Sequence, residues 1–170
     1  MFQRISADGA GTAVARLLLR TVVGSTMIAH GVKHGKSLDG TAGWFGSIGF
    51  RQPRLQAQLS AGVEVGGGAA LLLGAGTPLA ASVIIGTMGV AATSVHRPNG
   101  FFITSEGYEY VLNLAAASTA VAALGPGRYS VDSALGFDRK VGGGKAAALA
   151  VGLGIAGAAA QLAVFWRKPA

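Results

Sequence analysis

Hydrophobic residues along this chain fall into five blocks, separated by stretches in which glycine, proline and charged residues gather. A helix needs about 20 mainly apolar residues to cross a bilayer, and each block approaches or reaches that length. The pattern therefore predicts an all-α, polytopic transmembrane bundle with a four-helix core and a fifth C-terminal span. The predicted spans cover about 14–34, 59–76, 78–95, 109–125 and 146–166.

The links between the blocks differ in length and chemistry. The second and third blocks are separated by GAGTP, in which glycine ends one helix and Pro78 opens the next, so these helices should be antiparallel neighbours. The link 35–58 carries three aromatic residues among glycines and basic residues, which suits an interfacial or re-entrant segment, or else a plain surface loop. The link 125–144 is predicted to be a loop.

Composition supports a membrane protein. The chain has 170 residues, of which 51% are hydrophobic and 12% are charged, and its mean hydropathy is +0.49. Soluble domains are about 25% charged, roughly twice this share. Residues 1–137 are predicted to form the four-helix bundle, and residues 138–170 a loop with the additional span. The expected location is the inner (cytoplasmic) membrane of a cell, with several passes through the lipid bilayer.

The net charge of +7 is read as loops that meet anionic lipid head groups, because the basic residues fall mostly between the apolar blocks. Nucleic-acid binding is disfavoured, since no basic helix is present. The first block does not resemble a signal peptide, because Arg16 and Arg20 interrupt it and no small-residue cleavage site follows. The absence of cysteine excludes thiol redox chemistry and thiolate metal sites, so any redox role needs a bound cofactor or a partner.

Threading the helices back and forth brings many polar residues to one end of the bundle. That end receives His30, Lys33, His34, Glu64, His96, Arg97, Glu106, Tyr108, Glu109, Tyr110 and Asn113. The opposite end receives Arg20, which we expect to extend toward the lipid head groups. A buried partner is the alternative, although the sequence offers no obvious one nearby.

Glu64 lies about five residues inside its predicted helix, roughly 8 Å deep at 1.5 Å per residue. A charge at that depth costs several kcal/mol unless it is paired or hydrated, and His30 and Lys33 are the nearest basic residues by level. Two interpretations stay open: a polar pocket that binds a head group or relays a proton, and a structural ion-pair network. The candidates for ligand binding or proton relay are His30, Lys33, Glu64, His96, Glu109 and Asn113.

No catalytic residue is assigned, and no metal site is expected. His30 and His34, one helical turn apart, are a weak alternative as a metal-binding pair, because no further ligand pattern accompanies them. A haem held by His30 and His96 is weaker still.

Several motifs resemble those of the DoxX family of small bacterial membrane proteins. They are an arginine followed by HGVKHG in the first block, GVEVGGG in the second, and GYEYVLN and GPGRYSVD around the fourth. The resemblance extends over about 12–137, and the fifth block departs from the family pattern. The residues that match the motifs are Arg20, His30, Lys33, Glu64, Glu109, Arg128, Tyr129 and Asp132.

The resemblance implies a four-helix membrane bundle and an association with redox chemistry. Relatives belong to a thiosulfate:quinone oxidoreductase, and others resemble membrane anchors of oxidative-stress or sulfur-handling enzymes. The leading hypothesis is an accessory or anchoring subunit of a quinone-linked or oxidative-stress redox assembly, more readily a non-catalytic subunit than an enzyme. The alternatives are a quinone-reducing subunit in which Glu64 and His30 relay protons, and a small transporter or channel. A quinone is the cofactor expected, and the partners expected are other subunits or further copies of the chain.

The distribution of basic residues leaves the orientation open. One side receives Arg4, Arg16, Arg20, Arg128, Arg139, Lys140 and Lys145, and the other receives Lys33, Lys36, Arg51, Arg54, Arg97, Arg167 and Lys168. Seven against seven gives the positive-inside rule no preference. The compact basic group at 139–145 leads us to expect a cytoplasmic N-terminus.

Overall fold

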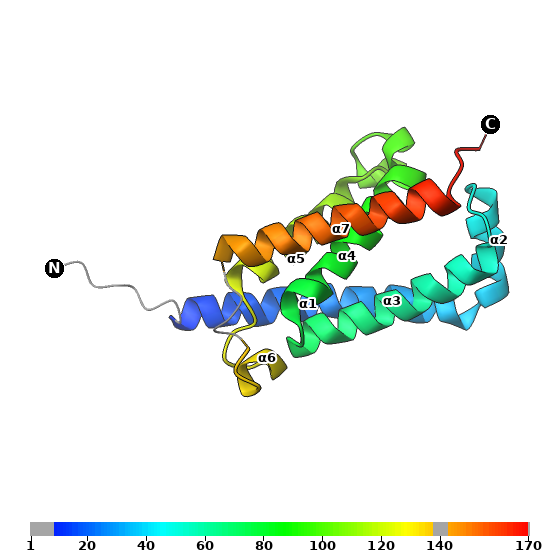
Figure 1. Cartoon of the computed structure of the whole chain (residues 1–170). Helices are drawn as coiled ribbons and strands as arrows, with labels where there is room; N and C mark the ends of the chain where they lie inside the picture. Colours follow the sequence, from blue (N-terminus) through cyan, green and yellow to red (C-terminus); the bar gives the residue numbers. More distant parts are fainter. Residues whose placement is uncertain (1–8, 138–142, 170) are drawn as a thin grey trace.

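The computed structural model describes residues 9–137 and 143–169, and its long elements are all α-helices (Figure 1). Arg4, Arg139 and Lys140, used above for orientation, lie outside the described residues. The long helices are α1 (Ala10–Lys36), α3 (Pro53–Leu73), α4 (Thr77–Ala91), α5 (Glu109–Leu124) and α7 (Gly143–Phe165). They correspond to the five predicted blocks, and the predicted helical membrane bundle is confirmed.

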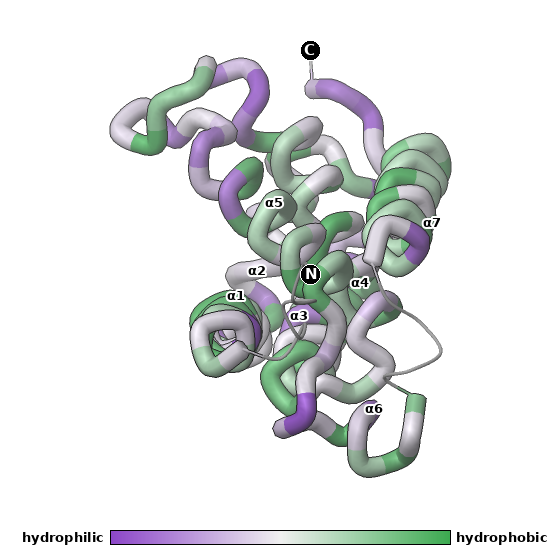
Figure 2. Tube along the Cα trace, turned by 90° about the vertical axis from the view of Figure 1, so that its left-hand side faces the viewer, coloured by the Kyte–Doolittle hydropathy of each residue, from purple (hydrophilic) through white to green (hydrophobic). Residues whose placement is uncertain are grey.

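Within residues 9–137 and 143–169, three helical segments are long and apolar enough to cross a membrane, namely Ala10–Lys36, Thr77–Asn99 and Gly143–Phe165, while Glu109–Leu124 is a shorter apolar helix. The view along the long helices shows hydrophobic residues over the helices and hydrophilic residues mainly in the connecting segments and the C-terminal tail (Figure 2). This distribution is the one expected when lipid surrounds the helices and water meets their ends.

The link between α1 and α3 contains a short helix, α2 (Leu38–Ser47), which lies across the ends of these long helices (Figure 1). Its Phe45 packs with Phe50 beneath it, and both are buried, whereas Trp44 is half-exposed. Of the two interpretations of this link, a plain loop is therefore wrong.

The turn between α3 and α4 is as tight as GAGTP predicts. Gly74 ends α3 in the left-handed conformation, with φ of 65°, and Pro78 stands in the first turn of α4. After α4 the chain continues through a π-helical turn, η1 (Ala92–His96), and two 3-10 turns, η2 (Arg97–Asn99) and η3 (Ile103–Ser105). The predicted loop after α5 contains a single helical turn, α6 (Val131–Ala134).

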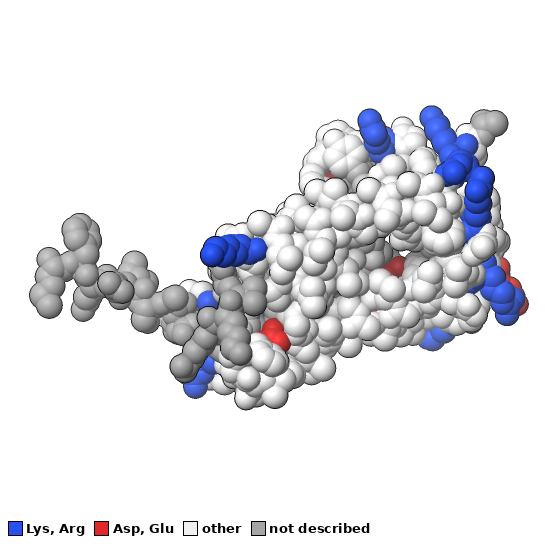
Figure 3. All heavy atoms as spheres, in the orientation of Figure 1, with Lys and Arg blue, Asp and Glu red and all other residues white. Residues whose placement is uncertain are grey.

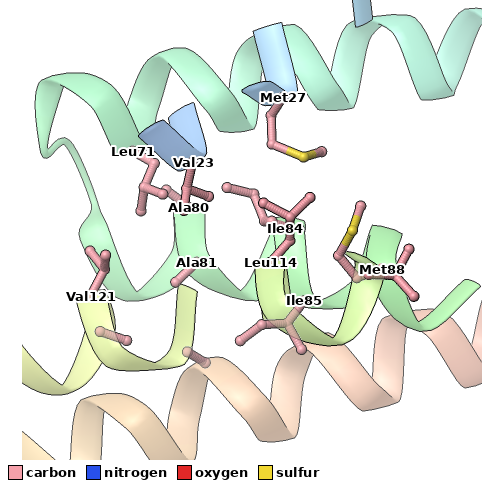
Figure 4. Close-up of a cluster of buried hydrophobic side chains, with 13 residues drawn as sticks. Val23, Met27, Leu71, Ala80, Ala81, Ile84, Ile85, Met88, Leu114 and Val121 are labelled. Carbon is pink, nitrogen blue, oxygen red and sulfur yellow. The ribbon is translucent and has the colours of Figure 1, made fainter. Parts of the chain in front are cut away.

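The core lies around α4, which packs against α3, α5 and α7 (Figure 4). Its buried residues Ala81, Ile84 and Met88 meet side chains of α1, α3 and α5. The backbones of α1 and α3 approach each other closely: a Cβ placed on Gly24 would lie 2.7 Å from the carbonyl oxygen of Gly68. Such contact between glycine faces stabilises helix pairs in lipid.

Candidate functional site

Glu64 is the centre of the candidate site. Its side chain leaves α3 toward the interior and is only 4% exposed. Ser60, one turn earlier on the same helix, donates a hydrogen bond of 2.5 Å from Oγ to Glu64 Oε1. His34 Nδ1, from α1, lies 2.9 Å from Ser60 Oγ and 3.3 Å from Glu64 Oε1. Because the Ser60 proton is directed at Glu64, the contact with His34 requires a hydrogen on Nδ1.

The second carboxylate oxygen, Glu64 Oε2, is buried and has no hydrogen-bond partner among the described residues. A buried, unpaired carboxylate oxygen costs free energy, whereas a donor placed beside it would recover a charge-assisted hydrogen bond. The site is therefore chemically incomplete at this atom, and it favours a ligand that carries a hydroxyl or N–H group.

Glu64 lines a cavity of about 680 Å³ between α1, α4 and α5, which we call the polar cavity. Its ionisable and phenolic lining groups are His30, Lys33, His34, Glu64, His96, Glu106 and Tyr110. The volume falls within the range of about 300–1,000 Å³ typical of small-molecule sites. The remaining lining is largely apolar, with Met27, Met88 and Leu114 at its inner end.

Hydrogen bonds orient two of the predicted histidines at this cavity. The Tyr110 hydroxyl, from α5, lies 3.3 Å from His30 Nε2, so this contact links α5 with α1. His96 Nδ1 lies 2.6 Å from the backbone carbonyl oxygen of Glu106, so Nδ1 carries the hydrogen and donates. His96 belongs to the π-helical turn, a local geometry often found at functional sites.

The partner of Glu64 differs from the one expected. The basic side chain in contact with Glu64 is His34, one helical turn beyond His30, while His30 and Lys33 line the same cavity and are both exposed. His34 and Ser60 are thus two residues of the site that are missing from the candidates for ligand binding or proton relay named from the sequence. The i, i+4 spacing of Ser60 and Glu64 on one helix is a signal that could have identified the serine.

Glu109 and Asn113 are not brought to the cavity wall. Glu109 Oε2 accepts a 2.9 Å hydrogen bond from the backbone N–H of Ile103, so it holds the loop before α5. The Asn113 side-chain amide donates to the backbone carbonyl of Glu109 at 3.0 Å and is exposed. Among the described residues there is no group of three or more histidine, aspartate or glutamate side chains that could hold a metal ion.

Arg20, at the opposite end, does not extend toward the head groups as predicted, since it is only 3% exposed. Its guanidinium donates to four backbone carbonyl oxygens, those of Leu71, Leu72, Pro126 and Tyr129, at 2.7–3.1 Å. The prediction was wrong because the acceptors come from the end of α3 and from the loop after α5, which only the fold brings together. Gly74 leaves the space, since a Cβ there would lie 2.7 Å from Arg20 Cζ.

Asp132 fixes the same loop to the turn between α3 and α4. Its carboxylate accepts hydrogen bonds from the backbone N–H groups of Gly76 and Thr77 and from the Thr77 hydroxyl, at 2.6–2.8 Å. Arg20 and Asp132 both matched the motifs noted in the sequence. The structure gives these two residues contacts with the backbone, away from the polar cavity.

Comparison with known proteins supports the motifs noted in the first two apolar blocks. A sequence model of the DoxX family matches residues 15–97, which run from within α1 to beyond the end of α4 and include the His34–Ser60–Glu64 group. "Putative oxidoreductase CatD" of Bacillus subtilis (strain 168) is 29% identical over 108 residues, which are 64% of this chain and 78% of that protein. No solved structure matches the chain. The resemblance to the DoxX family is thereby confirmed over residues 15–97.

Proposed function

We propose that this membrane protein is an accessory subunit of a redox assembly, and that its polar cavity holds a quinone head group. The observation that carries the proposal is the unpaired, buried oxygen of Glu64 on the wall of a cavity of about 680 Å³. A quinol hydroxyl is the kind of donor that this oxygen lacks. The name of the Bacillus subtilis relative, an oxidoreductase, is consistent with a redox setting.

The other groups of the cavity suit the two oxidation states of such a ligand. A quinone carbonyl needs a donor, which the Tyr110 hydroxyl can supply from α5. Trp44, whose ring centroid lies 6.4 Å from that of His34, adds an aromatic surface to the same wall. Aromatic rings favour offset or edge contacts with one another, so a quinoid ring would be held by Trp44 as well as by hydrogen bonds.

The chain has no cysteine, so it has no thiols of its own to supply electrons. In this proposal the electrons come from a partner enzyme, and the chain contributes the membrane anchor and the quinone site. The expected assembly contains this protein together with that enzyme, or further copies of the chain.

Binding can be tested with the purified protein in nanodiscs, using a benzoquinone and its reduced quinol as probes. Trp44 lines the cavity, so bound quinone should quench its fluorescence, and Trp44→Phe should remove that signal. We expect Glu64→Gln to weaken quinol binding by about tenfold or more, because a hydrogen bond to a charged group contributes about 1.5–3 kcal/mol. Glu109→Gln is the matched control, since Glu109 does not line the cavity.

Equal affinities for wild type and Glu64→Gln, or no saturable quenching by either probe, would contradict the proposal. Co-purification in mild detergent tests the second part, because an accessory subunit should bring a redox enzyme with it. In that complex Glu64→Gln should disturb assembly or quinone occupancy more than the enzyme's turnover with a soluble electron acceptor.

A second candidate function is quinone reduction with Glu64 and His30 as the proton relay. It is favoured by the hydrogen-bonded contacts His34–Ser60–Glu64 and Tyr110–His30, since His30, His34, Glu64 and Tyr110 all line the polar cavity. Reduction of a quinone to a quinol takes up two electrons, here from the partner enzyme, and two protons, which the relay would deliver. In this case Glu64→Gln should abolish quinol formation while leaving the purified complex intact.

A further inference from the structure

A second cavity, of about 190 Å³, also has Glu64 in its lining. We call it the apolar cavity, because Phe45, Ile48, Val63 and Val90 form much of its lining. The two cavities share His34, Trp44, Glu64, Thr87, Ala91 and Val95, so they adjoin along one wall. Whatever occupies the polar cavity at Glu64 therefore lies beside the apolar cavity as well.

The apolar cavity opens toward the lipid. Leu59 and Val63, on α3, line it and are also 45% and 41% exposed on the outer surface of the bundle. Figure 3 shows the surface hollowed between α7 and α3, with acidic atoms visible at the bottom of the hollow. Among the described acidic residues, Glu64 is the one that lines this cavity.

A side-chain hydrogen bond joins α3 and α7 beside this opening. The Gln161 side-chain amide, on α7, donates a 2.8 Å hydrogen bond to Oε1 of the buried Gln56 on α3. Beside this contact α7 packs mainly against α4 and α5. The hydrogen bond between Gln161 and Gln56 thus joins α7 to α3 beside the apolar cavity, which Gln161 also lines.

From this geometry we propose that the apolar cavity is a lateral opening that receives the tail of the ligand bound at Glu64. The ligand class is an amphiphile that lives in the bilayer: a ring or head with a hydrogen-bond donor, joined to a long apolar chain. The inference rests on the proposed function and adds to it the route of access, which runs from the hydrocarbon between α3 and α7. The water-facing end of the polar cavity, with its exposed Lys33, would then serve the head group and its protons.

Size and polarity support a tail in this position. The apolar cavity has less than a third of the volume of the polar cavity and lies below the usual range for a whole small-molecule site. A narrow apolar passage that ends beside a buried carboxylate fits a flexible chain better than a second head group.

The test compares two probes that differ only in the tail: a benzoquinol without a chain and the same benzoquinol carrying a decyl chain. Both affinities are measured by equilibrium binding of the radiolabelled probe to nanodiscs of one lipid composition, because the variants below add tryptophans, and the membrane concentration of each probe is determined separately. Val63→Trp should fill the opening from the lipid side. Val22→Trp is the matched control, because Val22 is 61% exposed on α1 and lines neither cavity.

We expect Val63→Trp to weaken binding of the decyl probe by about tenfold or more, because the larger side chain would occupy the space of the tail. The affinity of the tail-less probe should change by less than about threefold. Val22→Trp should change neither. Leu59→Trp, on the same wall, serves as a second obstruction and should give the same change in the ratio of the two affinities. An unchanged ratio in both obstructed variants would overturn the inference.

The proposed function and this inference can fail separately. If the tail-less probe does not bind wild type, the quinone site itself is wrong. If it binds and depends on Glu64, but the two probes keep the same affinity ratio in every variant, only the lateral opening is wrong. Mass spectrometry of co-purified lipid adds one more outcome: a phospholipid chain that the decyl probe does not displace would also overturn the inference.

Discussion

Replacement of Arg20 should strongly destabilise the fold without touching the polar cavity. The guanidinium is buried and donates to four backbone carbonyls, two at the C-terminal end of α3 and two in the loop after α5. The last carbonyls of a helix have no partner within the helix, and a positive charge there is also favoured by the helix dipole. One side chain therefore joins α1, α3 and the loop.

The magnitude follows from the number and type of contacts. Each hydrogen bond to a charged group contributes about 1.5–3 kcal/mol, so four would total about 6 kcal/mol at the lower end if they were independent. The four hydrogen bonds share one side chain, and water can reach some of the carbonyls once the side chain is removed. We therefore expect Arg20→Met to lower the free energy of unfolding by about 3–5 kcal/mol, the range found when a buried charge loses its partner. The free energy of unfolding of Arg20→Lys should lie between those of the wild type and Arg20→Met, because an ammonium group cannot reproduce the planar set of donors.

The assay is reversible unfolding in mixed micelles with increasing denaturing detergent, followed by tryptophan fluorescence. Arg128→Met is the control, because Arg128 is exposed and lies 4.7 Å over the Tyr129 ring, a contact that contributes about 0.5–1 kcal/mol at exposed sites. A loss of under about 1 kcal/mol for Arg20→Met, equal to that of the control, would refute the reasoning. Quinol affinity should stay unchanged in folded Arg20→Lys.

Three further predictions concern packing and orientation. Gly68→Ala should lower the free energy of unfolding by about 1–3 kcal/mol, because the added Cβ would lie 2.7 Å from a carbonyl oxygen of α1. In the same unfolding assay the control Gly66→Ala should not destabilise the protein, because its Cβ would meet nothing within 4 Å. Gln161→Leu should cost about 1–3 kcal/mol in that assay, because its buried partner on α3 then loses its hydrogen bond. If the N-terminus is cytoplasmic, an impermeant thiol reagent applied to intact cells should label Thr104→Cys and not Leu135→Cys, and the reverse result would invert the orientation.

The five long helices could be predicted from the sequence because each is marked by a block of apolar residues with glycine or proline at its ends. The end of the bundle at which the polar residues gather also follows, since antiparallel threading fixes it once the helices are counted. The separate status of residues 138–170 stays a prediction: in the structure α7 packs on α4 and α5, and Ala150 is part of the main core cluster.

The exact partner of Glu64 could not be predicted, because block length does not fix how two helices are rotated and shifted against each other. That register is set by the glycine contacts of α1 with α3. A Cβ on Gly31 would lie 2.8 Å from the carbonyl oxygen of Ala61, and this close approach brings His34, three residues later, to Ser60 and Glu64. The four carbonyl acceptors of Arg20 could not be predicted either, because backbone groups are common to all residues and leave no signal in the sequence.

The last turn of α7 has a consequence for the order in which the protein is made. Its backbone joins the segment after α2: the Arg51 N–H donates to the carbonyl of Phe165 at 2.7 Å, and the Arg167 N–H to that of Gly49 at 3.0 Å. The Trp166 indole adds a 2.8 Å bond to the carbonyl of Ile48. Residues 165–167 leave the ribosome after every other part of the site. The segment that follows α2, the helix that carries Trp44, can therefore form these hydrogen bonds only after α7 has been inserted.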